Sequence, residues 1–204
     1  MLPATSTVHP STEHPSTGHP ATGHTSTEQL EAGLDHVRAA PRSAGVLELI
    51  VRRPEIGERE VLAEGVLDLV EGLVGDNWRT RGSRMTPDRS AHPDMQLNVM
   101  SARAVALVAR EKERWQLAGD QLYVELDLSE ENLPPGTRLQ IGEAVIEVTA
   151  QPHLGCKKFV ERFGMDAMRM VNSEVGRALR LRGLNARVVE PGVIRAGDPV
   201  TRLA

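Results

Sequence analysis

The sequence predicts a mostly β protein with α insertions, a single domain that follows a disordered N-terminal tail. Two observations support the domain. Seven or eight short apolar segments are each bounded by glycine or proline, as in an antiparallel barrel or sandwich. A few segments with helical spacing of apolar residues interrupt them, which predicts the insertions. The third observation is the composition of the first 42 residues, which is that of a disordered segment.

The tail contains a repeat with a period of five residues over positions 8–27. Its histidines are His9, His14, His19 and His24. Proline, threonine, serine and glycine cannot bury enough area to offset the entropy of ordering, so we predict a disordered tail over 1–42 and one domain over 43–204. A histidine-rich tract can bind metal, but this spacing in a flexible chain gives only a weak, poorly preorganised site, and such tracts are more often plain linkers.

The first half of the domain is predicted to combine strands with one helix. A strand is expected over 45–53, a second strand pair or a bulge over 60–70 and a short extended segment over 96–100. A helix is expected over 102–117, after Ser101 as its N-cap. Between them lies a polar loop over 79–93 that carries four arginines.

The second half contains the clearest local motif, a β-hairpin. Two apolar segments flank Gly142-Glu143, and a leading glycine suits a two-residue type II′ turn. Short helices are then expected over 157–163, 166–171 and 173–181, with strands over 185–190, 193–195 and 200–203.

Composition excludes several classes of protein. No apolar run is long enough to span a bilayer, and the start shows no secretory signal, so we expect a cytoplasmic protein. One cysteine excludes an intramolecular disulfide framework and a multi-cysteine metal site. Residues 1–40 hold four of the 28 acidic and one of the 24 basic residues, which leaves 24 acids and 23 bases in the remainder. This near-neutral balance, with only Phe159 and Phe163 beside the basic residues for stacking, does not indicate nucleic-acid binding.

The only cysteine, Cys156, is the strongest candidate for chemistry. It follows a proline and a glycine in Gln151-Pro-His-Leu-Gly-Cys-Lys-Lys158, just before a predicted helix. A helix N-terminus and adjacent lysines favour the thiolate, the form that binds a soft metal or carries sulfur. The alternative is a small buried apolar residue without chemistry.

Positive charge is concentrated after the cysteine. Residues 157–187 contain eight basic and three acidic residues. Such a cluster can hold a phosphate through forked contacts, although a solvated helical face is the alternative. The candidate phosphate ligands are Lys157, Lys158, Arg177, Arg180 and Arg182.

Two further polar residues are candidates for a catalytic site with Cys156. His153 can ligate a metal or move a proton, or it can serve as a structural hydrogen-bonding residue. Asn98 can donate from its amide to an oxo group, or it can cap a turn.

Taken together, several segments in order resemble the MOSC family, named after the C-terminal domain of molybdenum cofactor sulfurase. The resemblance covers about residues 61–203, and no segment alone would be specific. The matching segments are Glu71-Gly-Leu-Val-Gly-Asp76, the 96–101 run into a helix, Leu122-Tyr-Val-Glu-Leu-Asp-Leu128, 133–148, Cys156, Ala186-Arg-Val-Val189 and Val193-Ile-Arg-Ala-Gly-Asp198.

The resemblance implies a MOSC-type antiparallel β-barrel and a site around one cysteine, matched here by Cys156. In relatives this cysteine ligates the molybdenum of a pterin cofactor or is proposed to carry sulfur. Molybdenum-dependent members reduce N-hydroxylated compounds with electrons from separate partners. The sulfurase's pyridoxal phosphate domain has no counterpart in this sequence, so pyridoxal phosphate chemistry is not expected within it.

The leading hypothesis is therefore a protein that binds the molybdenum cofactor (molybdopterin), with Cys156 as metal ligand and His153 and Asn98 beside it. It would reduce N-hydroxylated small molecules. The second hypothesis is a non-redox carrier that passes a Cys156 persulfide to a cofactor or metal–sulfur cluster acceptor. The third is a module that only binds a phosphorylated ligand. We expect a small-molecule substrate and a separate electron or sulfur donor protein, and neither nucleic acid nor a membrane as partner.

Overall fold

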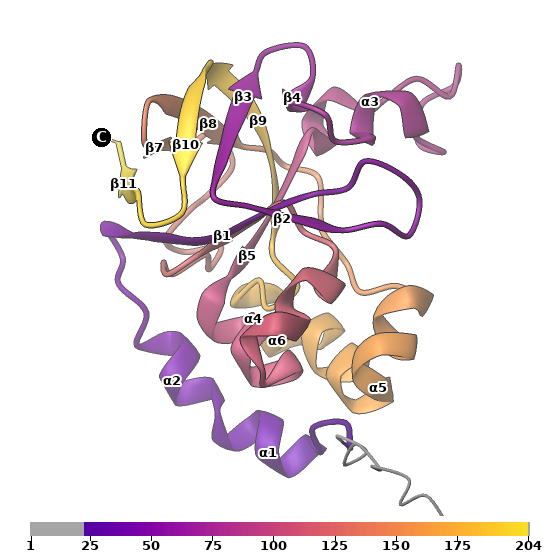
Figure 1. Ribbon diagram of the computed structural model, residues 1–204. Coiled ribbons are helices and arrows are strands. Elements are labelled where there is room, and N and C mark those ends of the chain that lie inside the picture. The colour runs from indigo at the N-terminus through magenta and orange to yellow at the C-terminus, as the bar shows by residue number, and fades with distance from the viewer. Residues whose placement is uncertain (1–22, 204) are drawn as a thin grey trace, which may run out of the picture.

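The computed structural model describes residues 23–203, and its centre is a closed β-barrel of seven strands (Figure 1). The strand order is β11-β7-β8-β9-β5-β6-β1, and β1 closes the barrel by pairing with β11. All pairs in the ring are antiparallel except β5 with β6. The prediction of a mostly β barrel is therefore confirmed. The strands are β1 (Ala44–Arg52), β5 (Leu97–Ser101), β6 (Leu122–Val124), β7 (Arg138–Ile141), β8 (Ala144–Val148), β9 (Leu184–Glu190) and β11 (Pro199–Arg202).

The barrel interior is filled by aliphatic side chains alone. Leu47, Val99, Leu139 and Ile146 are among its fully buried members, and the cluster contains no aromatic residue. This follows from a composition with only five aromatic residues. The branched side chains pack closely on a pleated surface and supply the apolar burial that holds the barrel together.

The predicted hairpin over 138–149 forms β7 and β8. Gly142 has a φ of 53°, a left-handed value that the first position of a type II′ turn requires. Glu143 is not among the non-glycine residues with positive φ, which separates this turn from type I′.

The predicted strand pair over 60–70 is divided between two sheets. Strand β2 (Glu60–Leu62) extends the barrel sheet beside β1, whereas β3 (Glu64–Asp68) joins a three-stranded sheet. That sheet has the order β10-β3-β4, with β4 (Gly72–Leu73) and β10 (Gly192–Arg195) at its edges.

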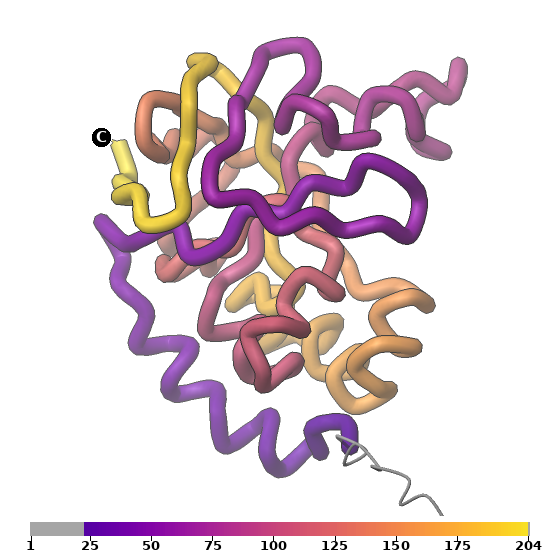
Figure 2. Tube along the Cα trace, in the orientation of Figure 1, coloured from indigo at the N-terminus to yellow at the C-terminus, as the bar shows by residue number. Residues whose placement is uncertain are grey.

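Several helices gather at one end of the barrel (Figures 1 and 2). They are α4 (Ala102–Ala109), η2 (Lys112–Ala118), α5 (Lys157–Asn172) and α6 (Glu174–Ala178). Four of the five aromatic residues lie under this layer, in a second apolar cluster that includes Tyr123 and Phe159. The single helix predicted over 102–117 is wrong, because Arg110 at φ 63° ends α4 and a 3₁₀ helix follows. The predicted break at Gly164 is confirmed as a kink in α5, where φ is 87°.

The predicted disordered tail over 1–42 is wrong for its last part. Residues 27–38 form α1 (Thr27–Ala32) and α2 (Leu34–Arg38), which pack against α5 and α4. Leu30, Leu34 and Val37 supply the reason: their spacing places them on one helical face, and each is at most 9% exposed. The folded unit therefore begins well before residue 43. The repeat up to position 22 lies outside the described residues.

Two short helical elements complete the described part of the chain, α3 (Trp78–Arg81) and η1 (Pro93–Met95), and Figure 1 shows α3 apart from α4, α5 and α6. Within residues 23–203, no helix combines the length and hydrophobicity that crossing a bilayer requires.

Candidate functional site

A cleft of about 310 Å³ opens where the barrel meets the start of α5. The three predicted catalytic residues line it: Cys156, His153 and Asn98. They come from the loop before α5 and from strand β5. The fold therefore brings together residues that lie up to 58 positions apart in the sequence.

Cys156 is the N-cap residue of α5, and its side chain is exposed. Its extended backbone lets its carbonyl accept the first helical hydrogen bonds, from the N–H groups of Phe159 at 2.9 Å and Val160 at 3.2 Å. The preceding Gly155 donates its N–H to Asn172 Oδ1 at 3.0 Å, which fixes the loop against the helix. The thiol thus lies at the N-terminus of α5 and lines the cleft. The alternative of a buried apolar cysteine is wrong.

A buried ion pair supports the floor of the cleft. The Arg53 guanidinium donates to both carboxylate oxygens of Asp76 at 2.8 Å, and the two side chains are 5% and 0% exposed. Arg53 Nη1 also donates to Asn98 Oδ1 at 3.0 Å. This contact continues through Asn98 Nδ2, which donates to Asn185 Oδ1 at 2.7 Å. Asn185 Nδ2 in turn donates to the carbonyl of Gln151 at 3.1 Å, at the start of the loop that carries His153 and Cys156.

Asn98 therefore connects the ion pair to the cysteine loop. The carbonyl oxygen and one amide hydrogen of the Asn98 side chain bond within the protein, and these contacts position the loop. The predicted hydrogen bond from the Asn98 amide to an oxo group of a ligand stays a prediction.

A second buried ion pair holds the opposite wall. Arg182 Nη1 donates to both oxygens of Asp120 at 2.9 and 2.7 Å, and Nη2 donates to the Ala118 carbonyl at 3.0 Å. The guanidinium carbon lies 5.2 Å from the centre of the Phe159 ring. These contacts occupy most of the donors of Arg182, so its main role is to anchor the start of α5.

His153 lies beside this pair without joining it. Its Nδ1 is 3.4 Å from Asp120 Oδ1, but it has no hydrogen-bond partner among the described residues. Burial, together with the nearby Arg182 and Arg53 charges, holds the pKa of His153 well below its ordinary value. The imidazole is therefore neutral at physiological pH.

The cleft is strongly positive beyond these pairs. Within residues 23–203, none of its four further cations has a carboxylate oxygen within 4.0 Å, and Glu55 is the only acid in the lining. Burial, followed by the charges of Arg162 and Arg53, lowers the pKa of Arg59. Such a concentration of one sign attracts an anion. The four cations are Arg59, Arg81, Lys158 and Arg162.

The predicted phosphate ligands do not form one group. Lys158 and Arg182 line the cleft, and Lys157 lines neither this cleft nor the cavity beside it. Arg177 and Arg180 line that second cavity, of about 230 Å³. Arg180 is also committed within the protein, since its Nη1 donates to the Leu133 carbonyl at 2.6 Å. The five residues therefore divide between two cavities, with Lys157 outside both, and their binding of a phosphate stays a prediction.

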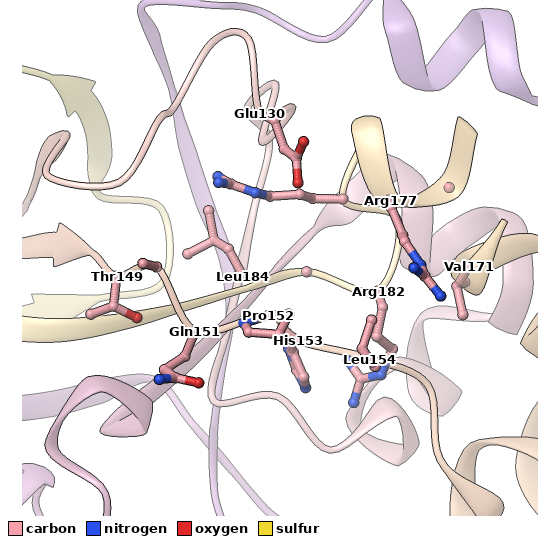
Figure 3. A pocket seen from close by; sticks show the side chains of 14 residues that line it. Glu130, Thr149, Gln151, Pro152, His153, Leu154, Val171, Arg177, Arg182 and Leu184 are labelled. Carbon is pink, nitrogen blue, oxygen red and sulfur yellow. The ribbon is translucent and has the colours of Figure 1, made fainter. Parts of the chain in front are cut away.

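Figure 3 shows the second cavity, with His153 and Arg182 at one edge and Glu130 at the opposite edge. His153 and Arg182 line both cavities and form the wall between them. The cleft itself depends on arginines that sequence reasoning did not select: Arg53, Arg59, Arg81 and Arg162. Arg53 ends the first predicted strand, Arg81 lies in the arginine-containing loop over 79–93, and Arg162 lies in the basic segment over 157–187. No sequence signal pointed to Arg59.

Comparisons with known proteins agree with this architecture. Residues 86–201 match the family model described as MOSC domain. The YuaD protein from Bacillus subtilis has a similar solved structure, with 16% identity, a TM-score of 0.59 and coverage of 77% of this chain and 94% of that chain. YiiM from Escherichia coli is 25% identical with a TM-score of 0.50, over 78% of this chain and 70% of that one. No curated protein sequence matches the chain.

Proposed function

This chain belongs to the MOSC domain family, and on that premise we propose that it binds a molybdenum–pterin cofactor in the Cys156 cleft and reduces N-hydroxylated small molecules. The family is associated with molybdenum cofactor binding. One observation carries the proposal: an exposed thiol at a helix N-terminus lines a cleft with four cations that have no carboxylate partner in residues 23–203.

The residues present fit the two chemically distinct ends of such a cofactor. The Cys156 thiolate is a soft ligand suited to a metal such as molybdenum, and as the only cysteine it fills one coordination position. Arg59, Arg162 and Lys158 fit the terminal phosphate, because none of them has a carboxylate partner in residues 23–203 and guanidinium forks match phosphate geometry. Arg59 Nε and Arg162 Nη1 donate to backbone carbonyls, which fixes the two guanidinium groups at the cleft while Nη2 of each has no partner in residues 23–203.

Bound there, the cofactor would supply two-electron redox chemistry at the metal. The protein's own contribution is to present the thiolate and to keep the wall of the cleft fixed. His153 adds a neutral imidazole, which can donate a hydrogen bond to a substrate or accept one from it without bringing a charge into the cleft. The two buried ion pairs hold the loop and the helix that carry these groups. The reduction of an N-hydroxyl group consumes two electrons and two protons and releases water, so a separate donor must supply the electrons.

A second candidate function rests on the exposure of the thiol. A protein that passes a persulfide to an acceptor must let the acceptor reach its sulfur, and Cys156 is exposed. In that case the chain would be a sulfur carrier without bound metal.

Metal and pterin content decides between these functions. Wild type, Cys156→Ser and Lys157→Ala would be purified from a host that makes the cofactor, and molybdenum and pterin would be quantified. We expect near-stoichiometric molybdenum in wild type and in Lys157→Ala, because Lys157 does not line the cleft, and its loss in Cys156→Ser. Absence of molybdenum from wild type, with the host supply verified, would contradict the proposal. A persulfide on Cys156 by mass spectrometry would then support the carrier.

A further inference from the structure

A separate group of arginines lies on α3 and the loop that follows it. Figures 1 and 2 show this segment at the edge of the molecule, extending away from the barrel. Arg81, Arg84 and Arg89 line a hollow of about 400 Å³ there, together with Gly82 and Ser83. No acidic residue lines the hollow.

The loop is closed by its own hydrogen bonds. The Ser83 N–H donates to the carbonyls of Arg89 at 3.3 Å and Ser90 at 3.0 Å, and Thr86 Oγ1 donates to the Ser90 carbonyl at 2.6 Å. Gly82 has a φ of 66° and lies so close to the Arg89 carbonyl that a side chain would collide with it. The backbone therefore brings Arg84 and Arg89 to the same hollow.

The charge of the hollow is not offset within the protein. Among residues 23–203, none of its three arginines has a carboxylate oxygen within 4.0 Å. Asp88 is the only acid in the loop, and its carboxylate accepts hydrogen bonds from the N–H and the hydroxyl of Ser90 at 3.0 and 2.7 Å. Three guanidinium groups around one concavity offer the forked donors that phosphate oxygens accept.

The hollow also adjoins the Cys156 cleft. Arg81 lines both, so one guanidinium stands between the cysteine site and the arginines of the loop. Burial and the Arg53 charge lower the pKa of Arg81, as expected where cations are crowded. A ligand long enough to reach past Arg81 would contact both places.

We propose that this hollow binds a phosphate or diphosphate group of a ligand whose remaining part lies in the Cys156 cleft. The extension into the cleft rests on the proposed function, whereas phosphate binding by the hollow does not. The phosphate can belong to a phosphorylated substrate or to a nucleotide extension of the cofactor, since both present the same chemistry.

Calorimetric titration with inorganic pyrophosphate tests the site on the full chain, purified without molybdenum. We expect saturable binding, and a Kd at least tenfold higher for the double variant Arg84→Ala/Arg89→Ala. Arg79→Ala is the control: Arg79 lies on α3, the helix that also carries Arg81, but it does not line the hollow. The proposal is overturned by a lack of saturable binding, by wild-type affinity in the double variant, or by an equal loss in Arg79→Ala, which would indicate general attraction.

The same titration on cofactor-loaded protein identifies the source of the phosphate. If the cofactor occupies the hollow, pyrophosphate binding disappears on loading. If the hollow serves a substrate, loaded and unloaded protein bind pyrophosphate equally. A protein that never takes up molybdenum would end the proposed function but would leave the pyrophosphate result intact, so the two failures are distinguishable.

Discussion

Replacing Arg53 with methionine tests whether the buried ion pair under the cleft holds this end of the barrel together. The variant keeps most of the apolar stem but removes both hydrogen bonds to Asp76 and the contacts to Asn98 and the Gly119 carbonyl. Asp76, with a side chain that is 0% exposed, would then be a buried carboxylate without its partner. Breaking such a pair costs about 3–5 kcal/mol.

Urea unfolding followed by circular dichroism measures this cost. With an m-value of about 2 kcal/mol/M, the midpoint should fall by roughly 1.5–2.5 M. Arg52→Met is the control: Arg52 is the neighbour on the same strand, and its pair with Glu60 is 31% and 45% exposed. That exposed pair should contribute no more than about 1 kcal/mol. Equal shifts in the two variants would refute the reasoning, because burial would then not set the cost.

Three further predictions concern other parts of the molecule. The pKa of His153 in the folded chain lies well below 6.5, its ordinary value. As the pH falls below 6.5, His153 therefore takes up a proton in the unfolded chain but not in the folded chain, and the folded state loses stability. Wild type should therefore lose up to about 1.4 kcal/mol of stability between pH 7.5 and 5.5, and the urea midpoints of His153→Gln should lack this loss. Leu30→Ala should lower the free energy of unfolding by about 2–5 kcal/mol, because Leu30 is fully buried. Glu31→Ala, at the exposed neighbour, should leave it nearly unchanged. Similar melting temperatures for the two variants would show that α1 does not pack against the domain. Gly176→Ala should lower the melting temperature, although alanine favours helices, because its methyl group would collide with the backbone of residues 170–171; a rise would contradict this packing.

Local patterns predicted the strands and the hairpin well, and they failed where packing decided the outcome. The predicted segments over 45–53 and 138–149 correspond to β1, β7 and β8, because alternation and a glycine turn are local signals. The helix over 102–117 was overextended, since the break at Arg110 depends on a single residue with positive φ. The end of the tail was missed because a composition averaged over 42 residues hides a short apolar helical face.

The candidate site was predictable only in part. Cys156 and His153 share one loop, so sequence proximity alone indicated that they lie together. The basic residues from 157 to 182 divide between two cavities, because Lys158 lies in the first turn of α5, Arg177 on α6, and Arg180 and Arg182 after α6. Arg59 and Arg162, which lie about a hundred positions apart, meet in the cleft through the barrel topology, and no spacing in the chain indicates this.

The sequence by itself determined the class of fold, the single thiol and its place before a helix, because turn residues, alternation and residue counts are properties of the chain alone. Only the tertiary structure decided which arginines have an acidic partner and which do not. Arg53 and Arg182 are neutralised by buried aspartates, whereas Arg59, Arg81 and Arg162 meet no carboxylate in residues 23–203. The physical reason is that an ion pair requires two groups within a few ångströms, and closure of the barrel sets which groups reach that distance.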